Sequence, residues 1–113
     1  MPLLNLKVSK DVEKKDELLK ELSKIVAECI GKPESYVMVF LEKANFCMAS
    51  EIGDSAFCDV KSIGGLSASV NKEISKKVCE LLQERLNIET NRVYLNFTNI
   101  KASEWGYNGS TFG

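Results

Sequence analysis

Pro2, the second residue of the chain, is the first position whose chemistry could matter. Aminopeptidases remove an initiator methionine that precedes proline, so we expect the mature chain to begin at Pro2. Its nitrogen would then be a free secondary amine, a group that can act as a general base. The alternative is structural, because a proline can open a strand at a place where no ladder hydrogen bond is lost. The opening residues MPLLNL do not by themselves decide between these interpretations.

The side chains that usually carry catalysis are few. The sequence has no histidine, which removes Ser–His and Cys–His nucleophile pairs and the commonest transition-metal ligand. Its cysteines have neither CxxC nor zinc-site spacing, so we expect reduced, buried thiols at Cys29, Cys47, Cys58 and Cys79. An enzyme of this sequence must therefore use another base, and we expect no metal and no other cofactor.

Three further groups could contribute to a binding site, although each also has a structural interpretation. Lys32 follows a predicted helix and could simply interact with the dipole of its C-terminus. The loop SIGGLS (62–67) precedes a second helix, whose free N–H groups suit an anion. It lacks the GK[ST] of a nucleotide P-loop, so a tight turn with an N-cap is the simpler interpretation. The tail carries aromatic residues that could equally be core or interface residues: Trp105, Tyr107 and Phe112.

Hydrophobic periodicity predicts the elements that must position these residues. Residues 3–8 alternate as a strand. Residues 12–30 have helical spacing, with Asp11 as a candidate N-cap and Gly31 as a stop signal. Residues 36–41 (YVMVFL) are almost wholly apolar, which is typical of a strand covered on both faces.

The same plan recurs at an offset of 56 residues, so that Leu22 matches Val78 and Gly31 matches Asn87. We therefore expect one domain, residues 1–113, made of two β-α-β repeats of about 1–56 and 57–113. Four strands with two helices on one face give an α+β fold, a two-layer β-α-β-β-α-β sandwich. The other sheet face is still apolar and has no cover in so short a chain, which predicts an oligomer.

Charge and hydropathy exclude several partners. The net charge is −1, with both signs interspersed, so no basic surface for nucleic acid or for a membrane is expected. No apolar run approaches a membrane span, and the first residues lack the plan of a signal peptide. We therefore expect a cytoplasmic protein without nucleic-acid or membrane partners.

Along its whole length the sequence resembles the macrophage migration inhibitory factor family, within the tautomerase superfamily. The resemblance rests on these segments: the initial MP, GKP (31–33), SIGG (62–65), ERLNIETNRVYLNF (84–97) and the tail NGSTFG. It implies a homotrimer of β-α-β-β-α-β subunits around a central channel, with a pocket between neighbouring subunits.

The resemblance also implies residue roles. Pro2 would be the catalytic base of a keto–enol tautomerisation, while Lys32 and the Ile63 backbone would hold the substrate's carboxylate or carbonyl. The adjacent subunit would donate Tyr94 and Asn96. The hydrophobic wall would be formed by Trp105, Tyr107 and Phe112. The family's assay substrates are phenylpyruvate, hydroxyphenylpyruvate and dopachrome derivatives, so a small aromatic 2-oxo acid is the expected substrate.

Departures from the family and alternative functions remain. In the stretch SAFC, Ser55 stands where mammalian members have the first cysteine of a CxxC, which argues against thiol oxidoreductase activity. A second functional class is a secreted cytokine mimic that binds a cell-surface receptor, with the tautomerase activity incidental. Family members leave cells without a signal peptide, so secretion is compatible with this sequence. A third reading is a ferredoxin-like small-molecule sensor or RNA module, and the lack of a basic, aromatic sheet face speaks against RNA.

Overall fold

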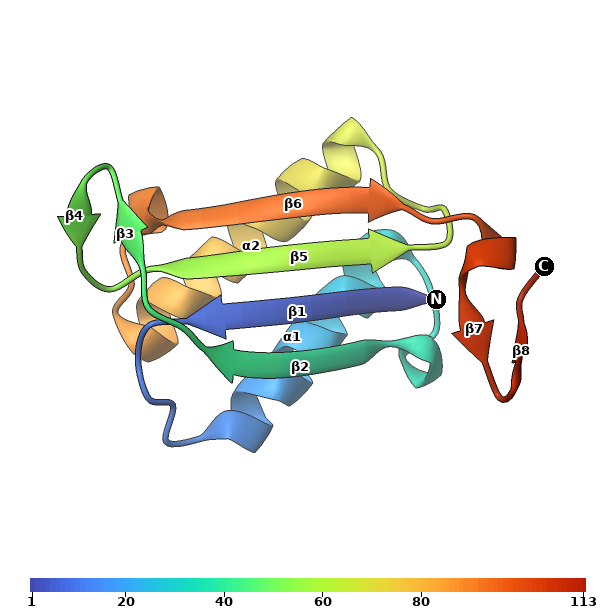
Figure 1. Cartoon of the computed structure of the whole chain (residues 1–113), viewed down its shortest axis with the longest axis horizontal. Helices are drawn as coiled ribbons and strands as arrows, with labels where there is room; N and C mark the ends of the chain where they lie inside the picture. Colours follow the sequence, from blue (N-terminus) through green and yellow to red (C-terminus); the bar gives the residue numbers. More distant parts are fainter.

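The computed structural model describes residues 1–113, and its layers follow from the alternation of apolar residues. In β1 (Pro2–Val8) and β5 (Ala56–Ser62) every second side chain is buried. Against this buried face lie α1 (Lys15–Ile30) and α2 (Ala68–Leu86), side by side behind the sheet in Figure 1. Their apolar stripes meet β1 and β5 in one hydrophobic core.

The four-stranded sheet has the order β2-β1-β5-β6, with β2 at Met38–Lys43 and β6 at Val93–Asn99. β1 runs parallel to β2, and β5 runs parallel to β6, while the central pair β1 and β5 is antiparallel. Each parallel pair is joined by one of the helices, so the chain is the predicted two-layer β-α-β-β-α-β sandwich.

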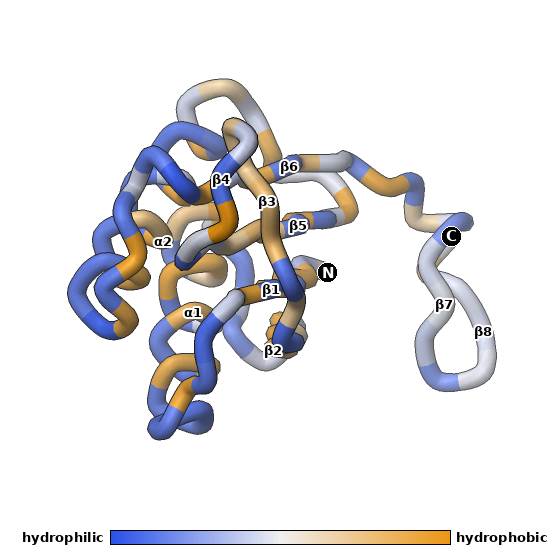
Figure 2. The backbone as a smooth tube through the Cα atoms, turned by 60° about the vertical axis from the view of Figure 1, so that its left-hand side comes forward, coloured by the Kyte–Doolittle hydropathy of each residue, from blue (hydrophilic) through white to orange (hydrophobic).

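The shorter elements lie at the two ends of the sheet, as Figure 1 shows. They are η1 (Glu34–Tyr36), β3 (Cys47–Met48), β4 (Glu51–Ile52), η2 (Thr90–Arg92), η3 (Ala102–Glu104), β7 (Gly106–Tyr107) and β8 (Ser110–Thr111). The hairpin β7–β8 stands away from the body of the subunit in Figure 2, beyond the end of the sheet that carries the N-terminus.

Both helices end at the residues predicted from their cap signals. Gly31 has φ 76° and Asn87 has φ 55°, and each donates its backbone N–H to a carbonyl of the last helical turn. Glycine and asparagine adopt this left-handed conformation at the lowest cost, which explains the stop at both positions. The repeat of 56 residues therefore corresponds to two equivalent helix ends.

The predicted start of the first helix was wrong. α1 begins at Lys15 rather than near residue 12, and no side chain caps it. Val12 is buried, so the segment before the helix turns inward instead of continuing the helical spiral. Asp11 is exposed and accepts a hydrogen bond of 3.0 Å from Lys43 at the end of β2, so it is not the N-cap.

The strand predicted at residues 36–41 begins two residues later, because Tyr36 belongs to η1. Only one face of β2 packs on the core in the single chain. The other face leaves Met38 63% exposed and Phe40 38% exposed. Burying such side chains in an interface removes apolar area from water, at about 25 cal/mol per Å².

Candidate active site

The N-terminal segment lies along the loop that follows β5. Pro2 is buried and stands opposite Ser62 in the antiparallel pairing. The backbone N–H of Ile63 donates a hydrogen bond of 3.4 Å to the carbonyl of Met1. The first residues are thus fixed at the edge of the core, where β1 starts without a ladder bond from the proline nitrogen.

Lys32 reaches the same loop from the end of α1. Its ammonium donates a hydrogen bond of 2.5 Å to the carbonyl of Ile63. The backbone N–H groups of Gly31 and Lys32 both bond to the carbonyl of Ala27, so the chain turns back on the last helical turn. This turn aims the Lys32 side chain at the loop after β5, and its partner there is a specific carbonyl.

The loop of residues 62–67 is the tight turn with an N-cap that the sequence predicted. Gly64 and Gly65 have φ values of 71° and 82°, which residues with a side chain rarely adopt. Ser67 is the N-cap of α2, and its hydroxyl accepts a hydrogen bond of 3.3 Å from the N–H of Val70.

The electrostatics of this corner favour a neutral amine. Burial and, next, the positive charge of Lys32 lower the pKa of the α-amino group of Met1 from its ordinary value. Both causes act against the ammonium form, by desolvation and by repulsion between like charges. The structure therefore brings the N-terminal amine, Lys32 and Ile63 together, and burial and the Lys32 charge increase the fraction of the amine that is unprotonated near neutral pH.

Tyr94 and Asn96 do not lie near Pro2 in the same chain. In the sheet register Asn99 pairs with Ser62, the partner of Pro2, whereas Tyr94 pairs with Phe57. At about 3.3 Å per residue, Asn96 thus lies roughly 10 Å and Tyr94 roughly 17 Å from this row, toward the start of β6. Both side chains are exposed, and Tyr94 is 66% exposed.

The tail aromatics are placed on the hairpin beyond the N-terminal end of the sheet (Figure 1). The rings of Tyr107 and Phe112 stack, with centroids 5.2 Å apart and planes inclined by 11°. The carbonyl of Trp105 accepts a hydrogen bond of 3.2 Å from the N–H of Phe112, which closes the hairpin. A flat stacked pair of this kind can form one wall for an aromatic ligand.

Two residues of this corner were missed by the sequence analysis. Tyr36 belongs to η1, the short helix at the same end of the sheet as the N-terminus (Figure 1), and is largely exposed. Its signal was an aromatic residue just after GKP, but it was assigned to a strand. Ser62 is fully buried, and its hydroxyl has no hydrogen-bond partner. An orphaned buried hydroxyl costs about 1–3 kcal/mol, so it is an uncommon feature beside a candidate base.

Two cavities of the single chain contain none of the predicted site residues. One, of about 560 Å³, lies between the start of α1 and the end of α2 and includes Lys10, Glu21 and Arg85. The other, of about 490 Å³, lies under the hairpin β3–β4 and includes Phe46 and Ile52. No three Cys, Asp or Glu side chains are arranged to hold a metal ion. No helix has the length and apolar character needed to cross a membrane.

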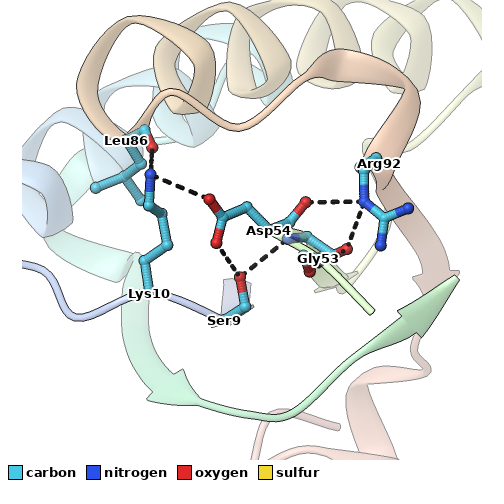
Figure 3. A network of polar contacts seen from close by, with 7 residues as sticks. Ser9, Lys10, Gly53, Asp54, Leu86 and Arg92 are labelled. Carbon is cyan, nitrogen blue, oxygen red and sulfur yellow. Dashed lines mark hydrogen bonds and ion pairs between the residues drawn. The ribbon is translucent and has the colours of Figure 1, made fainter. Parts of the chain in front are cut away.

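A polar network holds the far end of the sheet, and Figure 3 draws the part of it around Asp54. The guanidinium of Arg92 donates hydrogen bonds to Ser55 and to the carbonyls of Met48, Glu51 and Asp54, at 3.0–3.3 Å. Lys10 bonds to the carbonyl of Leu86 at 2.7 Å and pairs with Asp54 at 3.3 Å. Arg92 thereby fixes the hairpin β3–β4 to the start of β6.

Ser55 and Cys58 have structural surroundings. The hydroxyl of Ser55 is buried between Arg92 and the carbonyl of Gly53, at 3.0 Å and 3.1 Å. Cys58 faces the core, where burial strongly raises the pKa of its thiol, so the reactive thiolate is disfavoured. All four cysteines are free thiols, but the burial predicted for them was wrong for three: only Cys58 is buried, Cys29 and Cys79 are half-buried, and Cys47 is exposed.

The fold, a two-layer β-α-β-β-α-β sandwich with a proline at the head of β1, is that of solved macrophage migration inhibitory factor homologues. The family model for macrophage migration inhibitory factor (MIF) matches residues 1–113. A macrophage migration inhibitory factor homolog of Brugia malayi is 41% identical over 96 residues, 84% of this chain and 84% of that protein.

Solved structures agree with this assignment. A macrophage migration inhibitory factor homologue from Prochlorococcus marinus has 39% identity and a TM-score of 0.94, covering 98% of this chain and 99% of that one. A macrophage migration inhibitory factor-like protein from Entamoeba histolytica has 37% identity and a TM-score of 0.94, covering 98% of both chains. The chain therefore belongs to the macrophage migration inhibitory factor family, as the resemblance implied.

Proposed function

We propose that the protein is a keto–enol tautomerase of small aromatic 2-oxo acids, such as phenylpyruvate, with Pro2 as its general base after removal of Met1. The observation that carries this proposal is the convergence of the N-terminal amine, Lys32 and Ile63. Membership of the MIF family supports the same chemistry.

The reaction needs one proton to move between carbon and oxygen. The neutral Pro2 amine takes a proton from C3 of the keto acid, and the C3–H electron pair moves to form the enolate, with its charge on the 2-oxo oxygen. The same amine then returns the proton to that oxygen. Lys32 stabilises the developing charge and the carboxylate, since a fixed cation in a partly desolvated site acts strongly on an oxyanion. No cofactor enters this scheme.

Removal of Met1 would prepare the site in two ways. It would free the Pro2 nitrogen, which is an amide nitrogen while Met1 is attached. It would also free the N–H of Ile63, which now donates to the Met1 carbonyl. That N–H would be available to a carboxylate oxygen beside Lys32, as the role assigned to the Ile63 backbone requires.

We propose a homotrimer as the active form. The open apolar positions on the outer sheet face, such as Met38 and Phe40, favour a subunit contact there. Tyr94 and Asn96 lie too far along β6 to reach Pro2 of their own chain, so a role for them requires a neighbouring subunit. Trp105, Tyr107 and Phe112 are proposed to wall the shared pocket.

A phenylpyruvate tautomerase assay on the wild type and on Pro2→Gly tests the proposal. We expect activity in the wild type and its loss in the variant, with intact mass showing that Met1 is absent. Light scattering should give three times the mass of one chain. Equal activity of the two proteins would overturn Pro2 as the general base. A fully active monomer would overturn the homotrimer as the active form.

We propose extracellular signalling as a second function, supported by the naming of the curated relatives as macrophage migration inhibitory factors. A cytoplasmic pool would then be released without a signal peptide, and a cell-surface receptor would be the partner. Adding purified wild type and Pro2→Gly to migrating macrophages tests this function. Equal inhibition by both would make the tautomerase activity incidental, and no inhibition by either would exclude the signalling role. Fractionation of cells and medium would locate the protein.

A further inference from the structure

Gly65 makes an unusually close approach to the end of α1. A Cβ atom at this position would lie 2.7 Å from Cγ2 of Ile30 and 3.4 Å from Cε of Lys32. The first distance is too short for two carbon atoms, so a side chain at residue 65 would force a displacement. Ile30 is β-branched and cannot easily rotate away within the helix. The loop would therefore have to move off the helix end.

The neighbouring Gly64 provides the contrast. It has nearly the same left-handed conformation, with φ 71° against 82°, yet a Cβ there would meet no atom within 4 Å. The need for glycine at residue 64 is thus one of backbone conformation alone. At residue 65 a steric need is added to the conformational one.

The same loop also contacts Lys32. The loop that touches Ile30 through Gly65 also presents the Ile63 carbonyl to the Lys32 ammonium, at 2.5 Å. A loop displaced from the helix end would carry that carbonyl away from Lys32. The charge of Lys32 lowers the pKa of the N-terminal amine. The position of Lys32 therefore affects both the pKa of the base and, in the proposed reaction, the binding of the substrate's carboxylate.

We propose that Gly65 is a positioning residue of the active site: its missing side chain lets the loop 63–65 close on the end of α1 and holds the Lys32 ammonium beside the N-terminal amine. This inference rests on the proposed function for its kinetic consequence. The structural part of the inference, the position of the Lys32 side chain, does not depend on the proposed function.

The test compares Gly65→Ala with Gly64→Ala, which carries similar backbone strain without the contact. We expect kcat/KM for phenylpyruvate to fall in Gly65→Ala by roughly tenfold or more relative to Gly64→Ala, as for loss of one hydrogen bond to a charged group. Each substitution is repeated in a Lys32→Ala background. In that background Gly65→Ala and Gly64→Ala should have the same kcat/KM, because the side chain that Gly65 positions is absent.

A second measurement reports on Lys32 without any assay of activity. The N-terminal amine is titrated by NMR in protein carrying ¹⁵N-labelled proline. Gly65→Ala should raise the pKa of this amine toward its ordinary value, because the Lys32 charge moves away, while Gly64→Ala should not. If the wild type proves inactive on aromatic 2-oxo acids, the proposed function fails, but this titration still decides the role of Gly65.

If Gly65→Ala does not fold, the double variant Ile30→Ala/Gly65→Ala is compared with the single variant Ile30→Ala. Truncating Ile30 removes the 2.7 Å contact, so the double variant should fold and keep the amine pKa of Ile30→Ala. Equal amine pKa values in Gly65→Ala and Gly64→Ala would overturn the proposal. The proposal would also be overturned if, in the Lys32→Ala background, Gly65→Ala lowered kcat/KM more than Gly64→Ala does.

Discussion

The ammonium of Lys32 and the carbonyl of Ile63 are joined by a hydrogen bond of 2.5 Å, although the two residues lie 31 positions apart in the sequence. The backbone N–H of the same Ile63 donates to the carbonyl of Met1. One residue thus connects the end of α1 to the start of β1. Through it, a cation is placed beside the N-terminal amine, which is the arrangement that the proposed reaction requires.

Replacing Lys32 by alanine should weaken catalysis on anionic substrates with little change in fold. A hydrogen bond to a charged group contributes about 1.5–3 kcal/mol, so kcat/KM should fall by roughly tenfold to a hundredfold. Most of the loss should appear in KM if Lys32 mainly holds the carboxylate. Steady-state kinetics check this, with Lys24→Ala, an exposed position on α1, as the matched control. Equal losses of kcat/KM in Lys32→Ala and Lys24→Ala would refute a specific role for Lys32.

A residue retained in front of Pro2 should block binding as well as catalysis. Inserting alanine between Met1 and Pro2 should give a mature chain whose Ala carbonyl occupies the Ile63 N–H, as the Met1 carbonyl does here. Pro2→Gly leaves that N–H free. We therefore expect a competitive aryl carboxylate to bind at least about tenfold more weakly to the insertion variant than to Pro2→Gly, by calorimetry. Equal affinities would show that the Ile63 N–H does not hold the ligand.

Local signals explain what the sequence could predict. The strands follow a period of two, the helices one of 3.6, and both helix ends carry a residue suited to positive φ, so Gly31 and Asn87 were identified correctly. Asp11 failed as an N-cap because burial of the adjacent Val12 decides the path of the chain there. A cap signal is local, whereas burial depends on the whole fold.

The site was predictable in part only. The contact of Lys32 with Ile63 depends on how the end of α1 meets the loop after β5, which no local pattern encodes. The steric need for Gly65 depends on Ile30 in the same way. Tyr36 was placed in a strand because its β propensity resembles that of the residues after it, and the short η1 turn has no strong signal.

Arg92 should be the main polar contributor to stability at the far end of the subunit. Its side chain is 15% exposed and donates to Ser55 and three backbone carbonyls of the segment 48–54. Arg92→Ala leaves these acceptors without their donor, so we expect a loss of about 2–3 kcal/mol in the free energy of unfolding.

Arg85→Ala is the matched control for this change. Arg85 pairs with Glu21 on the exposed helix surface, where an ion pair contributes about 0–1 kcal/mol. Denaturant unfolding at a fixed protein concentration measures both variants, since an oligomer's stability depends on concentration. Similar destabilisation by the two substitutions would mean that the Arg92 network contributes little.

The pH dependence of the reaction should report on the amine itself. Burial and the charge of Lys32 lower the pKa of the N-terminal amine, and both causes would act on the Pro2 amine in the mature chain. A base works in its unprotonated form, so kcat/KM should rise with pH and level off above the amine pKa. We expect the midpoint below the ordinary α-amino range of about 7.7–8.0. The chain has no histidine to add a second titration in this region.

In Lys32→Ala the repulsion between the two positive charges is absent, so the midpoint of the pH profile should move up while the profile keeps its shape. A midpoint that does not move, or one that persists in Pro2→Gly, would assign the titration to another group.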